Sequence, residues 1–228
     1  MSSPVPSSPK KDTAGIAFLY ILALCIAWSG AWLLSLWLAK RYGFPGGPFG
    51  RFAYWLAARI LLWFLPSLAI LRRSGRSLRE VLGFDRIRAI LLWGGIAGLL
   101  WGGKTPLFQW LAGPPPHPIV WDWSFVTAVV YAPLIEEITF RGAVLGARET
   151  RMHFTMANLV TGILFLLIHL PGWYFEGFLA AGFTAAAGAA LGILLLGWIL
   201  GFVAHRSKSV AAATLAHMLN NFFQRFVS

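Results

Sequence analysis

The stretch AGIAFLYILALCIAWSGAWLLSLWLA, residues 14–39, contains no charged side chain. A helix of about 20 apolar residues is long enough to cross the roughly 30 Å hydrocarbon core of a bilayer. Residues 177–204 form a second uncharged run of similar length. Both runs predict membrane-spanning helices, and the fold class expected for the chain is an all-α, polytopic transmembrane bundle.

The composition of the whole chain agrees with this class. Of its 228 residues, 58% are hydrophobic and only 12% are charged, which excludes a disordered chain and disfavours a soluble domain. The net charge is +11, but the Lys and Arg residues cluster between the apolar runs. There they act as topology signals and contact anionic lipids, so we expect the lipid bilayer as a partner and not a nucleic acid.

Seven spans can be drawn, with one tail before them. The spans are at about 14–39, 52–71, 89–112, 121–147, 153–170, 178–204 and 209–226. Residues 1–13 are rich in Ser and Pro and predict a disordered tail, which leaves residues 14–228 as a single transmembrane domain.

The basic segment between the second and third spans, RRSGRSLREVLGFDRIR (residues 72–88), has a helical pattern of its own. Leu78, Val81, Leu82 and Phe84 are spaced to form one apolar face. A short interfacial helix is the preferred interpretation, and a solvated loop is the alternative.

The distribution of basic residues predicts the orientation. With seven spans and a cytoplasmic N-terminus, thirteen Lys and Arg residues fall on the cytoplasmic side and four on the other. The four are Lys40, Arg41, Arg51 and Arg225. Because cytoplasmic loops carry the excess of positive charge, we expect the N-terminus inside and the C-terminus outside.

The fourth span contains charges that a membrane helix rarely carries, in the sequence APLIEEITFRG (residues 132–142). Arg141 follows Glu137 by four residues, so the two side chains share a helix face and can form an ion pair. Glu136 lies about 100° around the helix and has no partner on its own face. We therefore expect one neutralised and one available carboxylate, with a purely structural polar cluster as the alternative.

Two further spans supply polar residues that could meet these glutamates. His169 ends the fifth span, and the turn between spans four and five lies midway between Glu136 and His169, which predicts similar depths for both side chains. In the seventh span His217 and Asn221 are four residues apart on one face, with Asn220 beside them. Polar residues inside membranes usually face a bundle interior or a cavity, so one shared site is expected.

These motifs resemble those of a known family. Glu136-Glu137-x-x-x-Arg141, Phe165-x-x-x-His169 and His217-x-x-x-Asn221 match, in order, the three motifs of the CAAX protease and bacteriocin-processing (CPBP, or ABI) family, which includes type II CAAX prenyl endopeptidases. The LREVLGFDR segment is also similar to this family, so the resemblance covers about residues 78–224, the expected catalytic core.

The resemblance implies an intramembrane endopeptidase in a multi-pass membrane protein, of the bacterial plasma-membrane type, that acts on a membrane-associated protein or peptide. It implies that Glu136 and His169 activate water and that His217 and Asn221 stabilise the oxyanion. Glu137 and Arg141 would orient Glu136. These roles agree with the strength of hydrogen-bond donors aimed at a developing oxyanion in a dry site.

The cofactor stays open at this point. Glu136, His169 and His217 together form a plausible zinc ligand set, yet the chain has no HExxH motif, and a metal-free, Glu-activated water explains the same residues.

Two other functions also fit part of the pattern. Glu, His and Arg at mid-membrane mark ion relays, which would suit a proton-coupled transporter, although no inverted repeat is evident. A non-catalytic membrane scaffold or immunity protein could keep the same motifs. The full motif set favours the protease.

Overall fold

The structure is a computed structural model that describes residues 13–113 and 118–226, so nearly all of the tail predicted at residues 1–13 lies outside it. The described residues contain helices and no strand, and the all-α class is confirmed. The helices are α1 (Ala14–Tyr42), α2 (Gly47–Arg59), η1 (Ile60–Phe64), α3 (Leu65–Arg73), α4 (Leu78–Leu82), η2 (Phe84–Arg86), α5 (Ile87–Ala89), η3 (Ile90–Gly95), α6 (Ile96–Ala112), α7 (Trp123–Phe125), η4 (Val126–Tyr131), α8 (Ala132–Glu137), η5 (Ile138–Leu145), α9 (Gly146–Arg148), α10 (Phe154–Leu167), α11 (His169–Phe175), η6 (Phe178–Ala181), α12 (Phe183–Ser207) and α13 (Val210–Gln224).

Each predicted span coincides with a helical run. Four runs are long and apolar enough to cross a membrane: Ala14–Tyr42, Gly47–Arg73, Phe154–Phe175 and Phe183–Ser207. The other three runs, α5 to α6, α7 to α9, and α13, are helical as predicted. They are shorter or carry the polar residues described below. The transmembrane bundle is confirmed, and the spanning role of these three runs stays a prediction.

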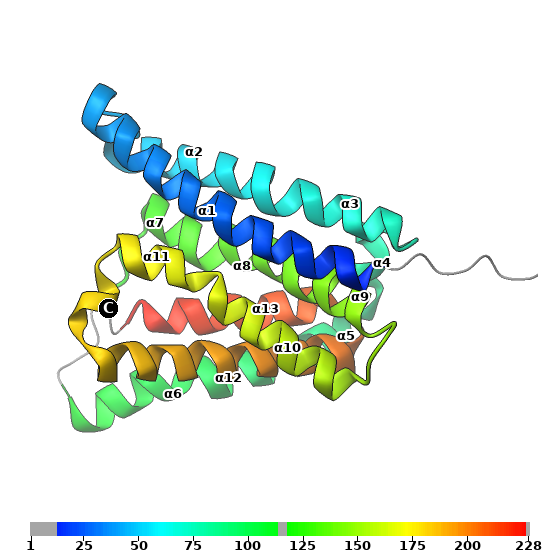
Figure 1. Ribbon diagram of the computed structural model, residues 1–228. Coiled ribbons are helices and arrows are strands. Elements are labelled where there is room, and N and C mark those ends of the chain that lie inside the picture. The colour runs from blue at the N-terminus through cyan, green and yellow to red at the C-terminus, as the bar shows by residue number, and fades with distance from the viewer. Residues whose placement is uncertain (1–12, 114–117, 227–228) are drawn as a thin grey trace, which may run out of the picture.

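Helix α13 lies inside the bundle and contacts α6, η3, α12 and α8 (Figure 1). The first two spans run side by side along one side of the bundle (Figure 1), where α1 contacts η1 and α3. The residues of α13 therefore have neighbours from most other spans, which makes this helix the natural place for a shared site.

Small residues allow α13 to approach its neighbour closely. The third span presents Gly94, Gly98 and Gly102 to α13 at intervals of one helical turn. A Cβ atom at Gly94 would lie 2.5 Å from the carbonyl oxygen of Ala212, and one at Gly102 would lie 2.7 Å from the Cα of Asn220. No side chain fits in such a contact, so glycine is required along this face of the third span.

Polar contacts join the second span to the span that carries the glutamates. The hydroxyls of Ser67 and Thr139 are hydrogen-bonded at 2.9 Å, and both residues are fully buried. Tyr20 of α1 donates its hydroxyl to the backbone carbonyls of Leu62 and Trp63 at 3.1 and 3.0 Å. These contacts fix the first two spans against η5.

The interfacial segment forms the predicted short helix, α4. Ser77 accepts a hydrogen bond from the Glu80 backbone, and the Glu80 carboxylate accepts one from the Ser77 N–H at 2.8 Å, which lowers the pKa of Glu80. Val81 is buried, but the Phe84 side chain is 63% exposed. The predicted apolar face stops short of Phe84, because α4 ends at Gly83 with a left-handed φ of 63° and Phe84 follows the helix.

Candidate active site

The two adjacent glutamates end helix α8 and are both buried. Glu137 accepts a hydrogen bond from Arg141 Nη1 at 3.0 Å through Oε1, and both side chains are fully buried. The predicted i,i+4 ion pair is confirmed. The same Oε1 atom lies 2.9 Å from Nδ1 of His217, 80 residues further along the chain.

Among the described residues Glu136 has its partner on another span and none on its own helix face, so the carboxylate expected to be available is engaged. Arg59, at the end of α2, places Nη2 3.5 Å from Glu136 Oε1. Residue spacing within one helix cannot reveal a partner that comes from another span. Glu137 bonds to Arg141 and to His217 and not to Glu136, so this pair contacts the other half of the site through the Glu137 carboxylate.

His169 stands where the fifth span bends. Helix α10 ends at Leu167 and α11 begins at His169, because Pro171 has no N–H to continue the hydrogen-bond ladder. Nδ1 of His169 lies 2.7 Å from the carbonyl oxygen of Phe165. A carbonyl can only accept, so Nδ1 carries the proton, and a neutral ring keeps a free lone pair on Nε2.

His217 is held in a comparable way. Its Nδ1 donates to the Glu137 carboxylate, so Nε2 is the nitrogen left for other partners. The ring of Phe165 makes edge contacts with both histidines, with centroids 4.8 Å from His169 and 6.0 Å from His217. Phe165 is fully buried and thereby spaces the two imidazoles.

The amide of Asn221 is also oriented by its neighbours. Its Nδ2 donates to the backbone carbonyl of Ala128 at 2.8 Å, and its Oδ1 accepts from Asn220 Nδ2 at 2.9 Å. One N–H of the Asn221 amide has no partner assigned by these two bonds. These contacts hold the end of α13 against η4.

One cavity of about 650 Å³ gathers these side chains. Its polar lining includes Glu136, His169, His217 and Asn221, so the residues predicted from three separate spans do come together. Glu137 and Arg141 are not among the residues that line the cavity; they are bonded to each other, and Glu137 is also bonded to His217. The walls include apolar and aromatic residues: Trp101, Trp173, Phe178, Ile193 and Leu196.

Two cations in the lining were not predicted as site residues. Arg59 and Lys104 interrupt apolar spans, and a lone charge in an apolar span indicates a polar partner or a cavity. The Lys104 ammonium lies 3.1 Å from the centroid of the Trp101 ring. The cavity therefore brings together two cations and one carboxylate.

Glu136, His169 and His217 are the possible zinc ligands. Each histidine has Nδ1 engaged and Nε2 free, as metal-binding histidines commonly do. Within residues 13–113 and 118–226, however, no three His, Cys, Asp or Glu side chains converge to hold one ion. The arrangement does not fit a three-ligand metal site, and no step below passes through a metal.

Comparison with known proteins supports the resemblance found in the motifs. Residues 118–223 match the family model described as "Type II CAAX prenyl endopeptidase Rce1-like". We call residues 118–223 the CPBP segment, since this match supports their resemblance to that family. It contains all the motif residues from Glu136 to Asn221 but begins later than the core expected at residues 78–224, so Arg59 and Lys104 lie outside it.

A curated protein matches part of the chain. A stretch of 98 residues, 43% of this chain, is 26% identical to the Bacillus subtilis (strain 168) protein named "Putative membrane peptidase YdiL". The match spans about a third of that protein's length, 34%. No solved structure matches the chain significantly.

Proposed function

We propose that the protein is an intramembrane endopeptidase that hydrolyses a peptide bond of a membrane-associated protein or peptide. One observation carries the proposal: Glu136, His169, His217 and Asn221, from three separate helical runs, line a single cavity. The cavity volume of about 650 Å³ lies in the range of ligand sites. The match of residues 118–223 to the type II CAAX prenyl endopeptidase model supports the reaction class.

The first half of the mechanism prepares water. Glu136 accepts a proton from a water molecule as its oxygen attacks the peptide carbonyl carbon, and the free lone pair on His169 Nε2 accepts the second hydrogen of that water as a hydrogen bond. Proton transfer to a positioned base contributes about 10²–10⁴-fold to the rate of such reactions. The same proton then passes from Glu136 to the leaving amine nitrogen as the C–N bond breaks.

The second half of the mechanism stabilises charge. The carbonyl oxygen becomes an oxyanion in the tetrahedral intermediate, and the unassigned N–H of Asn221 donates to it. Nε2 of His217 is turned away from Glu137 and donates as well when the ring carries a second proton. A single donor to an oxyanion is worth about 10²–10³-fold in kcat.

The test is cleavage of a membrane-peptide library by the purified protein in lipid vesicles, with products identified by mass spectrometry. In H₂¹⁸O, hydrolysis introduces one ¹⁸O atom into each new carboxyl group. Glu136→Gln and His169→Ala should each lower the rate at least about 100-fold, because each removes a group that handles the attacking water. Glu149→Gln, which removes an exposed glutamate paired with His205, is the matched control and should cleave normally.

Retention of more than about a tenth of the rate by Glu136→Gln would contradict its assignment as base. If the wild-type protein cleaves no member of the library, the hydrolase proposal fails, and the scaffold and transporter interpretations gain. The metal content of the cleaving protein, measured by mass spectrometry, tests the zinc alternative separately.

A further inference from the structure

We propose that Arg59 is a positioning residue for Glu136, and that the second span is therefore part of the catalytic unit although it lies outside the CPBP segment. This inference rests on the proposed function, since it assigns a role in the same reaction. It concerns a contact between residues 77 positions apart.

The contact is formed inside the cavity. Arg59 Nη2 and Glu136 Oε1 are 3.5 Å apart, and their side chains are 16% and 9% exposed. Both residues line the cavity together with His169. The contact engages Oε1 of Glu136 and leaves Oε2 as the oxygen that can accept the proton of water.

An aromatic cage holds the Arg59 guanidinium in place. Its central carbon lies 5.0 Å from the ring centroid of Trp28, 5.8 Å from that of Trp63 and 5.8 Å from that of Tyr131. These rings come from three different runs, α1, η1 and η4. A cation within about 6 Å of an aromatic face is attracted by it, and the attraction is stronger where water is excluded.

The cage explains how an arginine can be kept in an apolar span. The rings of Trp28 and Trp63 also contact each other edge to face, with centroids 5.3 Å apart, so the cage itself is packed. Nε of Arg59 has no hydrogen-bond partner among the described residues, and Nη2 is directed to Glu136. A planar guanidinium fixed by three rings can hold a carboxylate in one orientation, which a flexible ammonium cannot do as well.

The other charges near Arg59 do not duplicate this contact. Lys104 lines the same cavity but has no ion pair among the described residues, and its ammonium lies over Trp101. Desolvation raises the pKa of Glu176, an exposed residue just beyond α11, and Arg59 opposes this rise without forming an ion pair with it. Glu136 is thus the carboxylate that Arg59 contacts directly.

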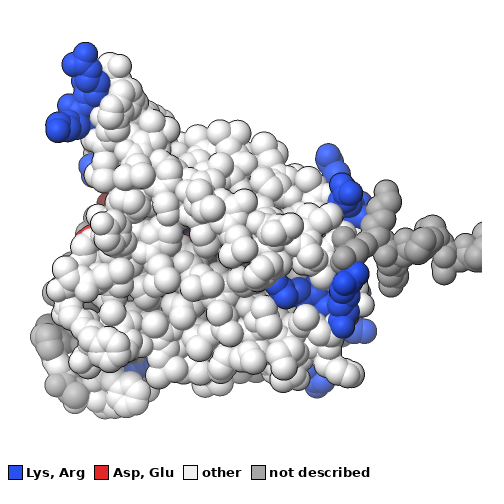
Figure 2. All heavy atoms as spheres, in the orientation of Figure 1, with Lys and Arg blue, Asp and Glu red and all other residues white. Residues whose placement is uncertain are grey.

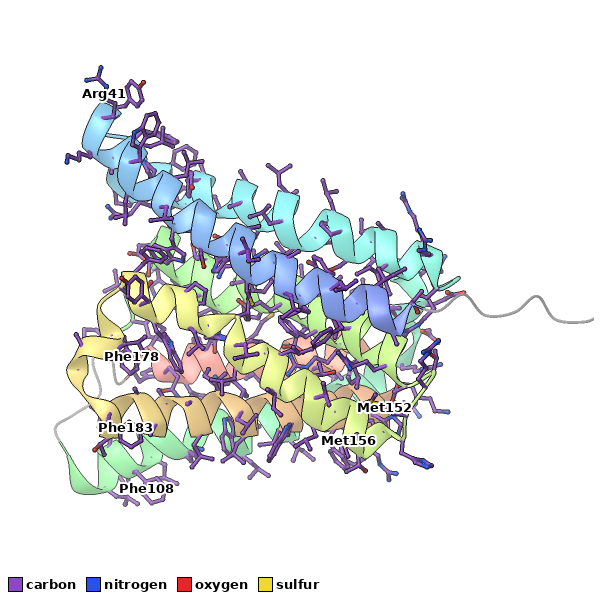
Figure 3. The ribbon with its side chains drawn as sticks, in the orientation of Figure 1. Arg41, Phe108, Met152, Met156, Phe178 and Phe183 are labelled. Carbon is purple, nitrogen blue, oxygen red and sulfur yellow. The ribbon has the colours of Figure 1, made fainter. Side chains whose placement is uncertain are left out.

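The kinetic test compares Arg59→Gln and Arg59→Lys with wild type. Arg59→Gln should lower kcat by roughly 10- to 100-fold with KM changed less than about threefold, because the loss affects the base and not substrate binding. Arg59→Lys should restore part of kcat, and added ethylguanidinium should partly rescue Arg59→Ala. Arg41→Gln is the control, since Arg41 extends from the far end of α1 away from the bundle (Figure 3).

Two results would overturn the inference. One is a kcat for Arg59→Gln within twofold of wild type. The other is a change confined to KM that appears with free-acid peptides but not with amidated ones, since Arg59 would then bind a substrate carboxylate. If Arg59→Gln fails to insert or fold, Arg59→Lys and the guanidinium rescue decide the question.

A readout that needs no protease activity separates this inference from the proposed function. Arg59 covers Oε1 of Glu136, so an apolar carbodiimide should modify this carboxyl group at least severalfold faster in Arg59→Gln than in wild type, as measured by peptide mass spectrometry. Equal labelling rates would overturn the role of Arg59. Faster labelling in a protein that cleaves nothing would support the contact and remove the protease.

Discussion

Phe165 shows how one apolar residue organises a polar site. Besides its contacts with His169 and His217, its ring lies 4.5 Å from the guanidinium carbon of Arg141. Its backbone carbonyl fixes the tautomer of His169. The four-residue spacing of the FxxxH motif therefore serves two contacts. Both the carbonyl and the ring of Phe165 contact the histidine one turn later.

Arg141 provides a stability prediction. Its Nη1 bonds to Glu137, and its Nη2 donates to the carbonyl of Gly197 at 2.8 Å, all fully buried. Arg141→Ala leaves a buried carboxylate without its cation, so we expect a loss of about 3–5 kcal/mol in unfolding free energy. The measurement is thermal or denaturant unfolding in detergent. An unchanged melting temperature for Arg141→Ala would contradict the structural importance of the pair.

At this scale the sequence predicted the contacts that are local in the chain. The Glu137–Arg141 pair follows from helical spacing alone. The contact of Glu137 with His217 joins residues 80 positions apart, and that of Arg59 with Glu136 joins residues 77 positions apart. Helical periodicity within one span carries no information on which faces of two spans meet, so these partners could not be derived from it.

At the scale of helices, the contact between α6 and α13 decides where the C-terminal motif lies. A Cβ atom at Gly98 would come 2.7 Å from the Cβ of Leu219 and 3.1 Å from the Cα of Ala216. His217 lies between these two residues in α13. Any side chain at Gly98 must therefore push α13 away from the third span and displace His217 with it.

We expect Gly98→Leu to reduce cleavage strongly while the protein still inserts. Gly95→Ala, three residues earlier, is the matched control, because a Cβ atom there would meet nothing within 4 Å. Gly95→Ala should be neutral or slightly stabilising, since Ala is the better helix former by about 1 kcal/mol. Peptide cleavage and melting temperature measure both variants. Equal behaviour of the two would contradict the close approach of these helices.

The helical runs were predictable because apolar length is a strong signal, and their boundaries agree closely with the structure. The glycine face of the third span was not predicted, although its four-residue spacing is visible in the sequence. Small residues at one-turn intervals indicate close packing but do not identify the partner helix. The partner, α13, is separated from Gly98 by more than a hundred residues.

At the scale of the whole molecule, the surface charges lie near the ends of the bundle. Figure 2 shows a broad uncharged band between Lys and Arg side chains gathered at opposite ends of the visible face. Arg141 was counted among the cytoplasmic charges, but it is buried and paired, which leaves twelve basic residues against four. The excess still predicts a cytoplasmic N-terminus.

Cysteine accessibility tests this orientation. In a Cys25→Ser background, Arg41→Cys and Arg206→Cys place single thiols at exposed positions at the ends of α1 and α12. A membrane-impermeant maleimide added to intact spheroplasts should label Arg41→Cys and spare Arg206→Cys until the membrane is opened. The reverse pattern would contradict the predicted topology, and labelling of both would contradict the span count between them.

The glycine face of the third span also determines the position of α13 along the bundle axis. If α13 slid by one turn, about 5.4 Å, the larger Asn220 and Phe223 would take the places of Ala216 and Leu219 beside Gly98. The close contacts oppose such a slide, so we expect His217 and Asn221 to keep a constant depth relative to Glu136. For the proposed hydrolase, the consequence is that the scissile bond would be selected by how deeply it lies in the bilayer more than by the residues that flank it.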